Sequence, residues 1–174
     1  MIKRIIAAVL AAAALLTFTA CGKDKETAAD TAVTAPVRDL EETYQSLLAM
    51  QADTGLSAPV MFAEDSTDVI EQLYSGLSQI KLTQRVAYMS PVTSYACEVL
   101  LVEAADPADV PAITDIFNAR INIGAVGSGD AESRDVWSRN AKVQTSGSCV
   151  AMIVLPDGYI IPENIFEYSP APVE

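Results

Sequence analysis

The first regular hydrophobic pattern of the chain lies between residues 40 and 55. Asp39 stands before it and Glu42 three residues later, an arrangement typical of an N-cap with a supporting acid at the start of a helix. Apolar residues then recur at helical spacing until Gly55, namely Leu40, Tyr44, Leu47 and Leu48. The pattern predicts an amphipathic helix.

A second, shorter helical pattern begins near Asp65 or Ser66. Its apolar residues fall on one helical face, and they are Val69, Ile70, Leu73 and Leu77. Gly76 weakens the pattern because glycine disfavours a helix interior. The N-terminal part of the domain is therefore expected to contain two helices.

Four later segments have the composition of β-strands: 81–89, 93–103, 142–145 and 149–155. The sequence 90–92 is expected to form a hairpin turn between the first two, and Ser146-Gly147 joins the last two. In segment 93–103, alternate residues form two faces. One face holds Tyr95, Cys97, Val99 and Leu101, and the other holds Ala96, Glu98, Leu100 and Val102. Both faces are mostly apolar, so this strand is expected to be central.

A further helix is predicted between the two pairs of strands. Asp106 followed by Pro107 is a strong helix start. The stripe expected to pack on the sheet consists of Val110, Ile113, Phe117 and Ile121. The glycines at 124, 127 and 129 are expected to end this helix, and the residues through Trp137 are expected to form a loop.

Together these elements predict the fold class. The order is two N-terminal helices followed by β-β-α-β-β. Such an order indicates an α+β domain in which helices cover one face of a largely antiparallel sheet.

The N-terminus has the layout of a secretory signal. Lys3 and Arg4 precede an apolar run over 5–16, and small residues follow at 19 and 20. The run is too short for a membrane-spanning helix, which needs about 20 apolar residues. Cleavage near residue 20 would leave either a soluble secreted protein or a lipid-anchored one.

The sequence Phe18-Thr19-Ala20-Cys21 resembles a lipobox, the cleavage and lipidation signal of bacterial lipoproteins, although position 18 is usually Leu. The resemblance implies that residues 1–20 are removed as a lipoprotein signal peptide. It also implies that Cys21 becomes the N-terminus and carries a diacylglyceryl thioether, with acyl chains such as palmitate. Two acyl chains hold a protein far more firmly than one. The protein is therefore expected on the cell membrane, lipid-anchored and facing outside the cytoplasm.

The anchor is expected to carry one domain on a tether. Residues 21–37 are small and polar without an apolar period and predict a flexible tether, which as a coil reaches roughly 20 to 25 Å. Residues 38–170 are expected to form the single domain, since a hydrophobic content of 51% is enough for one core.

The charge of the chain narrows the classes of partner. The net charge is −12, and removal of residues 1–20 would make it −14 because that segment contains two bases and no acid. A polyanion of this size is repelled by nucleic acid, so no nucleic-acid partner is expected. A membrane contact through the N-terminal lipid is expected, with a protein or a small molecule as the further partner.

The chain contains no histidine, so it lacks the commonest general base and metal ligand. Ser78 and Lys81 spell the Ser-x-x-Lys motif of penicillin-recognising enzymes, and Ser138-Arg139-Asn140 resembles their second motif. The third motif is absent and Lys81 is expected to start a strand, so a connection between a helix and a strand is the favoured interpretation. No catalytic residue and no cofactor is expected.

Two loop patterns have some features of ligand sites. The glycines over 124–129 suggest a phosphate loop, but they follow a helix C-terminus, where the helix dipole repels phosphate. Asp130, Glu132 and Asp135 lack the regular spacing of a calcium loop. A helix cap with a flexible loop, and solvated acids, are the favoured interpretations, so no metal site is expected.

Two cysteines lie on predicted strands. Cys97 and Cys149 would be exported, which allows a disulfide, but each lies among small and apolar residues. Two buried thiols are the favoured alternative, and alkylation with mass analysis separates the two by 2 Da.

Glu98 and Arg120 predict an ion pair between sheet and helix. Glu98 interrupts an apolar strand face, and Arg120 lies three residues after Phe117, beside the stripe that contacts the sheet. A structural pair is favoured over a ligand-binding carboxylate and guanidinium. Arg120→Ala is then expected to destabilise the domain by about 3 to 5 kcal/mol.

Three short motifs carry a resemblance to a known family: Ser94–Val99, Asn118-Ala119-Arg120 and Val150–Val154. Together they resemble a family of uncharacterised lipoproteins of Gram-positive bacteria that carries a domain of unknown function. The resemblance spans roughly 40–155. A tyrosine-proline element often follows the helix in that family, whereas this chain has the glycine-rich sequence 123–130. The resemblance implies no activity, cofactor or catalytic residue.

The sequence thus predicts a membrane-anchored extracytoplasmic lipoprotein whose domain is a non-catalytic binding or structural module. The alternative is a small cell-envelope enzyme that uses acidic residues. Two facing carboxylates in a pocket would favour the enzyme, and a shallow apolar groove or a flat surface would favour the module.

Overall fold

The computed structural model of the chain describes residues 39–92 and 95–167. The predicted signal sequence, Cys21 and the predicted tether lie outside the described residues. So do Thr93 and Ser94, which belong to a predicted strand and to one family motif, and the end of the predicted domain at 168–170. Within the described ranges, no helix is both long enough and apolar enough to cross a bilayer.

A five-stranded antiparallel sheet forms the centre of the fold, and its strand order is β1-β2-β3-β5-β4. The strands are β1 (Phe62–Ala63), β2 (Leu82–Met89), β3 (Glu98–Ala104), β4 (Lys142–Ser146) and β5 (Cys149–Val154). The predictions of an α+β fold and of an antiparallel sheet are confirmed. β3 begins at Glu98, later than the predicted start at 93, and β1 was not predicted.

β3 is central because both of its faces are apolar. Val99 and Leu101 pack into the core on one face of the sheet, whereas Leu100 and Val102 pack into the core on the other. β5 beside it is buried along its whole length. Since neither strand has a polar face for solvent, both faces of the sheet need a cover.

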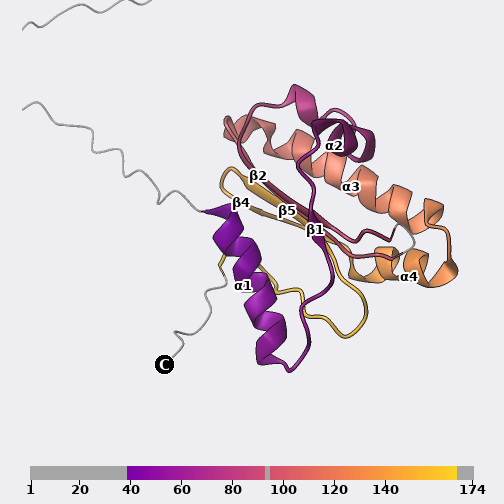
Figure 1. The fold of residues 1–174 in the computed structure, drawn as a ribbon. Helices are drawn as coiled ribbons and strands as arrows, with labels where there is room; N and C mark the ends of the chain where they lie inside the picture. Colours follow the sequence, from indigo (N-terminus) through magenta and orange to yellow (C-terminus); the bar gives the residue numbers. More distant parts are fainter. Residues whose placement is uncertain (1–38, 93–94, 168–174) are drawn as a thin grey trace, which may run out of the picture. The chain divides into compact units, whose positions relative to one another are not determined.

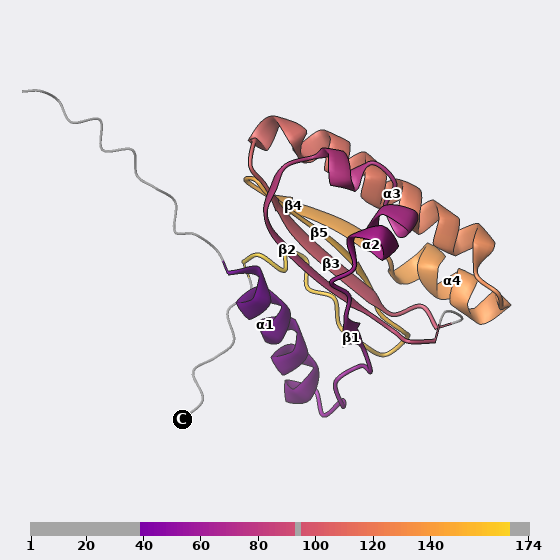
Figure 2. The ribbon, with the colours of Figure 1, turned by 45° about the horizontal axis from the view of Figure 1, so that its top comes forward.

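Helix α1 (Leu40–Asp53) covers the first face (Figures 1 and 2). Leu40, Tyr44 and Leu47 pack there with Ile165 and Phe166 of the C-terminal segment. The side chain of Asp39 caps the helix by accepting hydrogen bonds from the backbone N–H groups of Glu41 and Glu42, at 2.8 and 3.3 Å.

The second face is covered by α2 (Thr67–Leu73), α3 (Val110–Gly127) and α4 (Ala131–Asn140) (Figure 2). Two short 3-10 turns, η1 (Leu77–Gln79) and η2 (Pro107–Asp109), precede β2 and α3. Helices therefore lie on both faces of the sheet, and the prediction of helices on one face is wrong.

The region after the predicted third helix also differs from the prediction. α3 runs through Gly124 and ends at Gly127, so Gly124 lies inside the helix. The segment through Trp137, predicted as a loop, forms α4, which begins where Asp130 accepts a hydrogen bond from the N–H of Ser133 at 2.7 Å. Packing of Trp137 into the core on the second face of the sheet stabilises α4.

Candidate functional site

An ion pair joins strand β3 to helix α3 on the second face of the sheet. Glu98, the first residue of β3, points to the same face as Leu100, and Arg120 descends from α3. The Arg120 Nη2 lies 2.6 Å from Glu98 Oε2 and the Nε lies 3.2 Å from Oε1, a bidentate geometry. The structure thus brings together the two charged residues that the sequence analysis paired.

Tyr74, the residue that ends α2, completes the hydrogen bonds of Glu98. Its hydroxyl donates to Glu98 Oε1, and its ring packs edge-on against Phe117 with the ring centres 5.5 Å apart. Burial and the nearby Glu98 carboxylate raise the pKa of Tyr74 well above its usual value. The phenol therefore stays protonated and remains a donor.

Trp137 of α4 holds the guanidinium from the other side. The Arg120 guanidinium carbon lies 4.6 Å from the centre of the Trp137 ring, within the range of a cation-π interaction. Trp137 can approach this closely because α3 presents Gly124 to it. A Cβ atom at Gly124 would lie 2.2 Å from the ring.

The pair is almost removed from water but carries no net charge. The exposed fraction is 6% for the Glu98 side chain and 14% for that of Arg120. Burial disfavours the charged guanidinium, but hydrogen bonding to Glu98 and its negative charge outweigh burial and raise the pKa of Arg120. The guanidinium therefore stays ionised beside its carboxylate partner.

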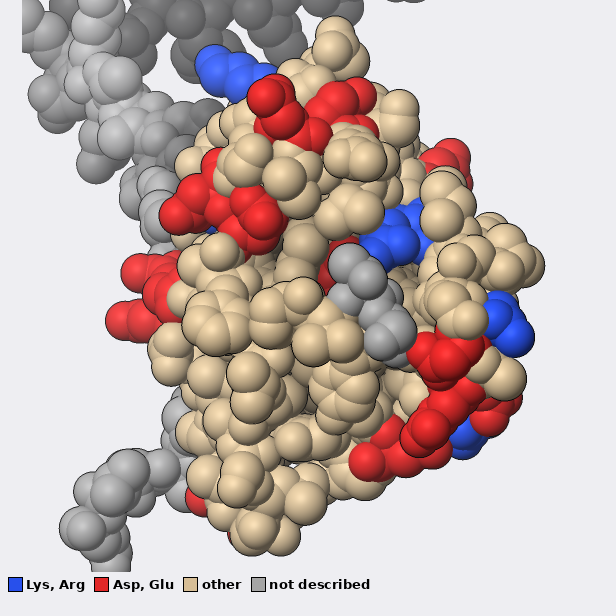
Figure 3. Space-filling model, turned by 45° about the vertical axis from the view of Figure 1, so that its right-hand side comes forward, with Lys and Arg blue, Asp and Glu red and all other residues tan. Residues whose placement is uncertain are grey.

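A hollow of about 550 Å³ opens beside this pair. Its wall comes from α2, the facing ends of β2 and β3, the C-terminal part of α3 and α4. We call this space the Arg120 hollow. Its apolar lining includes Val69, Leu73, Met89, Val92, Ile123 and Trp137. Most of the molecular face seen in Figure 3 is uncharged, and acidic side chains gather at its top, left and lower right borders.

The rim of the Arg120 hollow exposes large apolar side chains. Val92, Tyr95 and Ile123 are 55%, 47% and 57% exposed, and all three line the hollow. Isolated exposed apolar residues are ordinary on protein surfaces, but a group of them around one concavity is typical of a ligand site.

Arg120 retains donors that its partners in the described chain do not use. Nε and Nη2 bind Glu98, whereas Nη1 has no hydrogen-bond partner within residues 39–92 and 95–167. Every fully buried side-chain nitrogen or oxygen in those ranges has a partner, so Nη1 is not fully buried, in agreement with the 14% exposure of the Arg120 side chain. Since Arg120 lines the hollow, these N–H groups are available to a molecule inside it.

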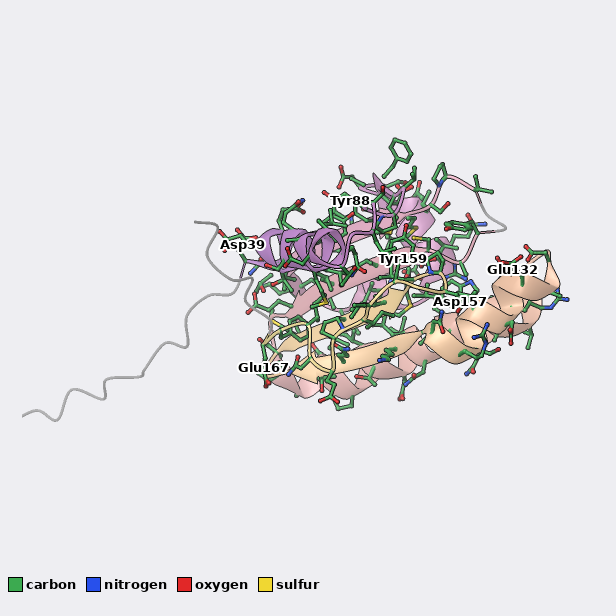
Figure 4. All side chains as sticks on the ribbon, turned by 90° about the horizontal axis from the view of Figure 1, so that it is seen from below. Asp39, Tyr88, Glu132, Asp157, Tyr159 and Glu167 are labelled. Atoms are coloured by element: carbon green, nitrogen blue, oxygen red, sulfur yellow. The ribbon has the colours of Figure 1, made fainter. Side chains whose placement is uncertain are left out.

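A separate hollow of about 440 Å³ is acidic, with Asp130, Glu132 and Asp157 in its lining. Figure 4 shows Glu132 and Asp157 at the α4 end of the domain, far from Asp39. Asp130 caps α4, as described above. Asp157 accepts hydrogen bonds from Asn140 at 2.9 Å and from Arg139 at 3.1 Å, and these bonds lower its pKa. A carboxyl with a lowered pKa is a poor proton donor.

The residues that resemble motifs of penicillin-recognising enzymes lie on different elements of the fold. Ser78 lies in η1, and the strand β2 begins directly after Lys81. Ser138 lies on α4 and its hydroxyl donates to the carbonyl of Arg134. Among the described residues, no cluster of acids and cysteines has the arrangement of a metal site.

The two cysteines are buried free thiols. Cys149 lies opposite Glu103 in the sheet, and Cys97 lies six residues back along the chain from Glu103. Six strand residues span about 20 Å. Since the Cα atoms of a disulfide lie within about 7 Å, this geometry separates the two thiols beyond bridging distance.

Sequence reasoning missed Tyr74 and Trp137. Trp137 carried a usable signal, because Asp130 is a good N-cap and Asp135 and Arg139 have the i,i+4 spacing of a helical ion pair, observed at 2.8 Å. Tyr74 had no local signal, because it ends a helix and acts only through its position against Glu98.

Comparisons with protein-family models, with curated protein sequences and with solved structures found no match to this chain.

Proposed function

We propose that the protein is a lipid-anchored extracytoplasmic binding module that holds a small molecule in the Arg120 hollow. One observation carries the binding function: the Arg120 guanidinium, with its unused Nη1 group, lines a concavity with a large apolar lining and rim. A few polar groups on an apolar wall are what small-molecule sites commonly present. The family of Gram-positive lipoproteins suggested by the short motifs stays part of this proposal.

The N-terminal sequence supports the lipid anchor. Charged residues, an apolar run and small residues before Cys21 supply the order that lipoprotein processing requires.

Fractionation of the native host tests the anchor. Cys21→Ser is expected to move the protein from the membrane to the soluble fraction, because the thioether cannot form. Cys149→Ser is the matched control, since Cys149 is a buried core thiol, and this variant is expected to stay on the membrane. A Cys21→Ser protein that stays as firmly bound as the parent would contradict the anchor.

A screen of small molecules tests the binding function. Trp137 is the only tryptophan and lines the hollow, so its single indole N–H resonance reports occupancy without a label. Molecules that shift this resonance saturably are expected. Their affinity should fall for Ile123→Ser, which removes an apolar rim residue, and stay unchanged for Val126→Ser, an exposed residue of α3 outside the lining. Ligands that bind both variants equally would place the site elsewhere.

The enzyme alternative rests on acidic residues, and the acidic hollow is where it would act. There one oxygen of Asp130 and both oxygens of Asp157 are already bound by structural donors. The larger hollow supports the binding module instead, because Arg120, whose Nη1 group is unused, belongs to its lining.

A further inference from the structure

We propose that the Arg120 hollow selects an uncharged ligand in which a carbonyl oxygen lies next to an apolar group, as in a blocked apolar amino acid. This inference rests on the proposed binding function and adds the chemical class of the ligand. It follows from three properties of the hollow: which polar groups are already used, the sign of the surrounding charge, and the apolar surface of the wall.

The first property is that Arg120, in the lining of the hollow, offers a hydrogen-bond donor. The Glu98 carboxylate accepts three hydrogen bonds, two from Arg120 and one from Tyr74, and its side chain is only 6% exposed. The Nη1 group of Arg120 is unused and not fully buried, as shown above. A ligand must therefore bring an acceptor to this position, because a guanidinium has no acceptor atom.

The second property is that the surroundings disfavour an anion. Glu98 already neutralises the guanidinium, and Glu64 lies in the same lining. The C-terminal turn of α3, from Gly124 to Gly127, also lines the hollow, and a helix C-terminus carries partial negative charge. The N-terminus of α4 does not offset this, because the Asp130 carboxylate caps it. The net charge of −12 acts in the same direction.

A cation is disfavoured for a different reason. A positive group beside Arg120 would approach its guanidinium, whose counter-charge on Glu98 is already bound in a bidentate pair. A neutral carbonyl oxygen can accept from Nη1 without meeting either repulsion. Charge compensation within the pair thus converts an ion-pair residue into a neutral hydrogen-bond donor site.

The third property is the apolar wall. Leu73, Met89, Ile123 and Trp137 line the hollow from α2, β2, α3 and α4, so an apolar group would meet side chains from four elements. Burying such a group releases about 25 cal/mol for each Å² removed from water. The volume of about 550 Å³ is in the usual range for a small-molecule site.

Three probes that differ mainly in charge test the ligand class: N-acetyl-L-leucinamide, N-acetyl-L-leucine and L-leucinamide. They are neutral, anionic and cationic near pH 6.5, and all three carry the same side chain and a carbonyl oxygen. Each is titrated into the folded protein while the Trp137 indole resonance is followed. The neutral probe is expected to shift it saturably and to bind about tenfold more tightly than either charged probe, since like charges at close range are strongly disfavoured.

Variants connect the preference to Arg120. Arg120→Lys keeps a positive partner for Glu98 but removes the planar fork, and it is expected to weaken the neutral probe by about tenfold. If this variant does not fold, the charge series on the unmodified protein decides alone. Ile123→Ser is expected to weaken all three probes, and Val126→Ser none of them.

The outcomes separate this inference from the binding function. Tighter or equal binding of either charged probe in the hollow would overturn the preference for a neutral ligand while the binding function stands. The same holds if no probe binds but the small-molecule screen finds ligands that depend on Ile123. If neither the probes nor the screen shifts the Trp137 resonance, both proposals fail.

Discussion

Removal of the Arg120 guanidinium should expose how strongly Glu98 depends on it. Arg120→Met keeps an unbranched apolar side chain over Trp137 and deletes only the charged, hydrogen-bonding end. Glu98 then stays at the start of β3 with an exposed side-chain fraction of 6% and keeps only the hydrogen bond from Tyr74. A buried carboxylate without a counter-charge is strongly disfavoured.

The size of the effect follows from this burial. Breaking a buried ion pair by removing one partner costs about 3 to 5 kcal/mol. For a domain of this size, each kcal/mol lowers the Tm by about 3 to 4 °C, so Arg120→Met is expected to lower the Tm by roughly 10 to 20 °C at neutral pH. Glu98→Gln combined with Arg120→Met should recover at least half of the loss, because the second change removes the buried charge.

Calorimetry at several pH values provides the assay. In the Arg120→Met protein, Glu98 is expected to take up a proton in the folded state, whereas the unfolded chain releases that proton above about pH 4.3. The folded state then binds more protons than the unfolded state, so stability falls as the pH rises through that value. The deficit relative to the parent should therefore be larger at neutral pH than under mildly acidic conditions.

Arg139→Met is the matched control. Arg139 contacts two carboxylates, those of Asp135 and Asp157, but its side chain is 52% exposed. Exposed ion pairs contribute little, so this variant should shift the Tm by only a small fraction of the Arg120→Met effect. An unchanged Tm for Arg120→Met, or equal losses for the two variants, would refute the reasoning about burial.

Two further predictions concern packing and the thiols. Gly124→Ala should destabilise the domain by about 1 to 3 kcal/mol in urea unfolding, because the new Cβ would lie 2.2 Å from Trp137. Gly127→Ala is the control and should be neutral or stabilising, because the nearest contact of its Cβ would be at 3.9 Å. Equal effects of the two substitutions would contradict the close approach of Trp137 to Gly124. Burial raises the pKa of Cys97 to about 12, and both Cys97 and Cys149 are buried free thiols. Iodoacetamide at pH 8 should therefore modify them only after the protein is unfolded, and no reductant should be needed. A mass gain of 2 Da on reduction would instead reveal a disulfide.

The local pattern of apolar and polar residues was sufficient to predict an element's place in the fold where neighbouring residues alone determine that place. Period-two alternation placed β3 at the centre of the sheet, and the turn sequence at Ser146-Gly147 joined β4 to β5. The pairing of Glu98 with Arg120 was also accessible, because a charge among buried residues needs a counter-charge and Arg120 lies beside the stripe that contacts the sheet.

Local pattern failed where a distant residue decides the conformation. Gly124 was expected to end a helix, but Trp137, thirteen residues later, packs against it and the helix continues. The apolar residues on both sides of β3 implied a cover on both faces, yet which helix takes which face depends on the path of the whole chain.

The sequence by itself determined the charge balance, and it predicted β2 to β5 and the need of Glu98 for a partner, because each depends on neighbours along the chain or on composition. Only the tertiary structure decided that Tyr74 and Trp137 enclose that pair and that a hollow opens beside it. The physical reason is that a cavity is the space left between packed elements. Its position depends on all of their side chains at once and on no single segment.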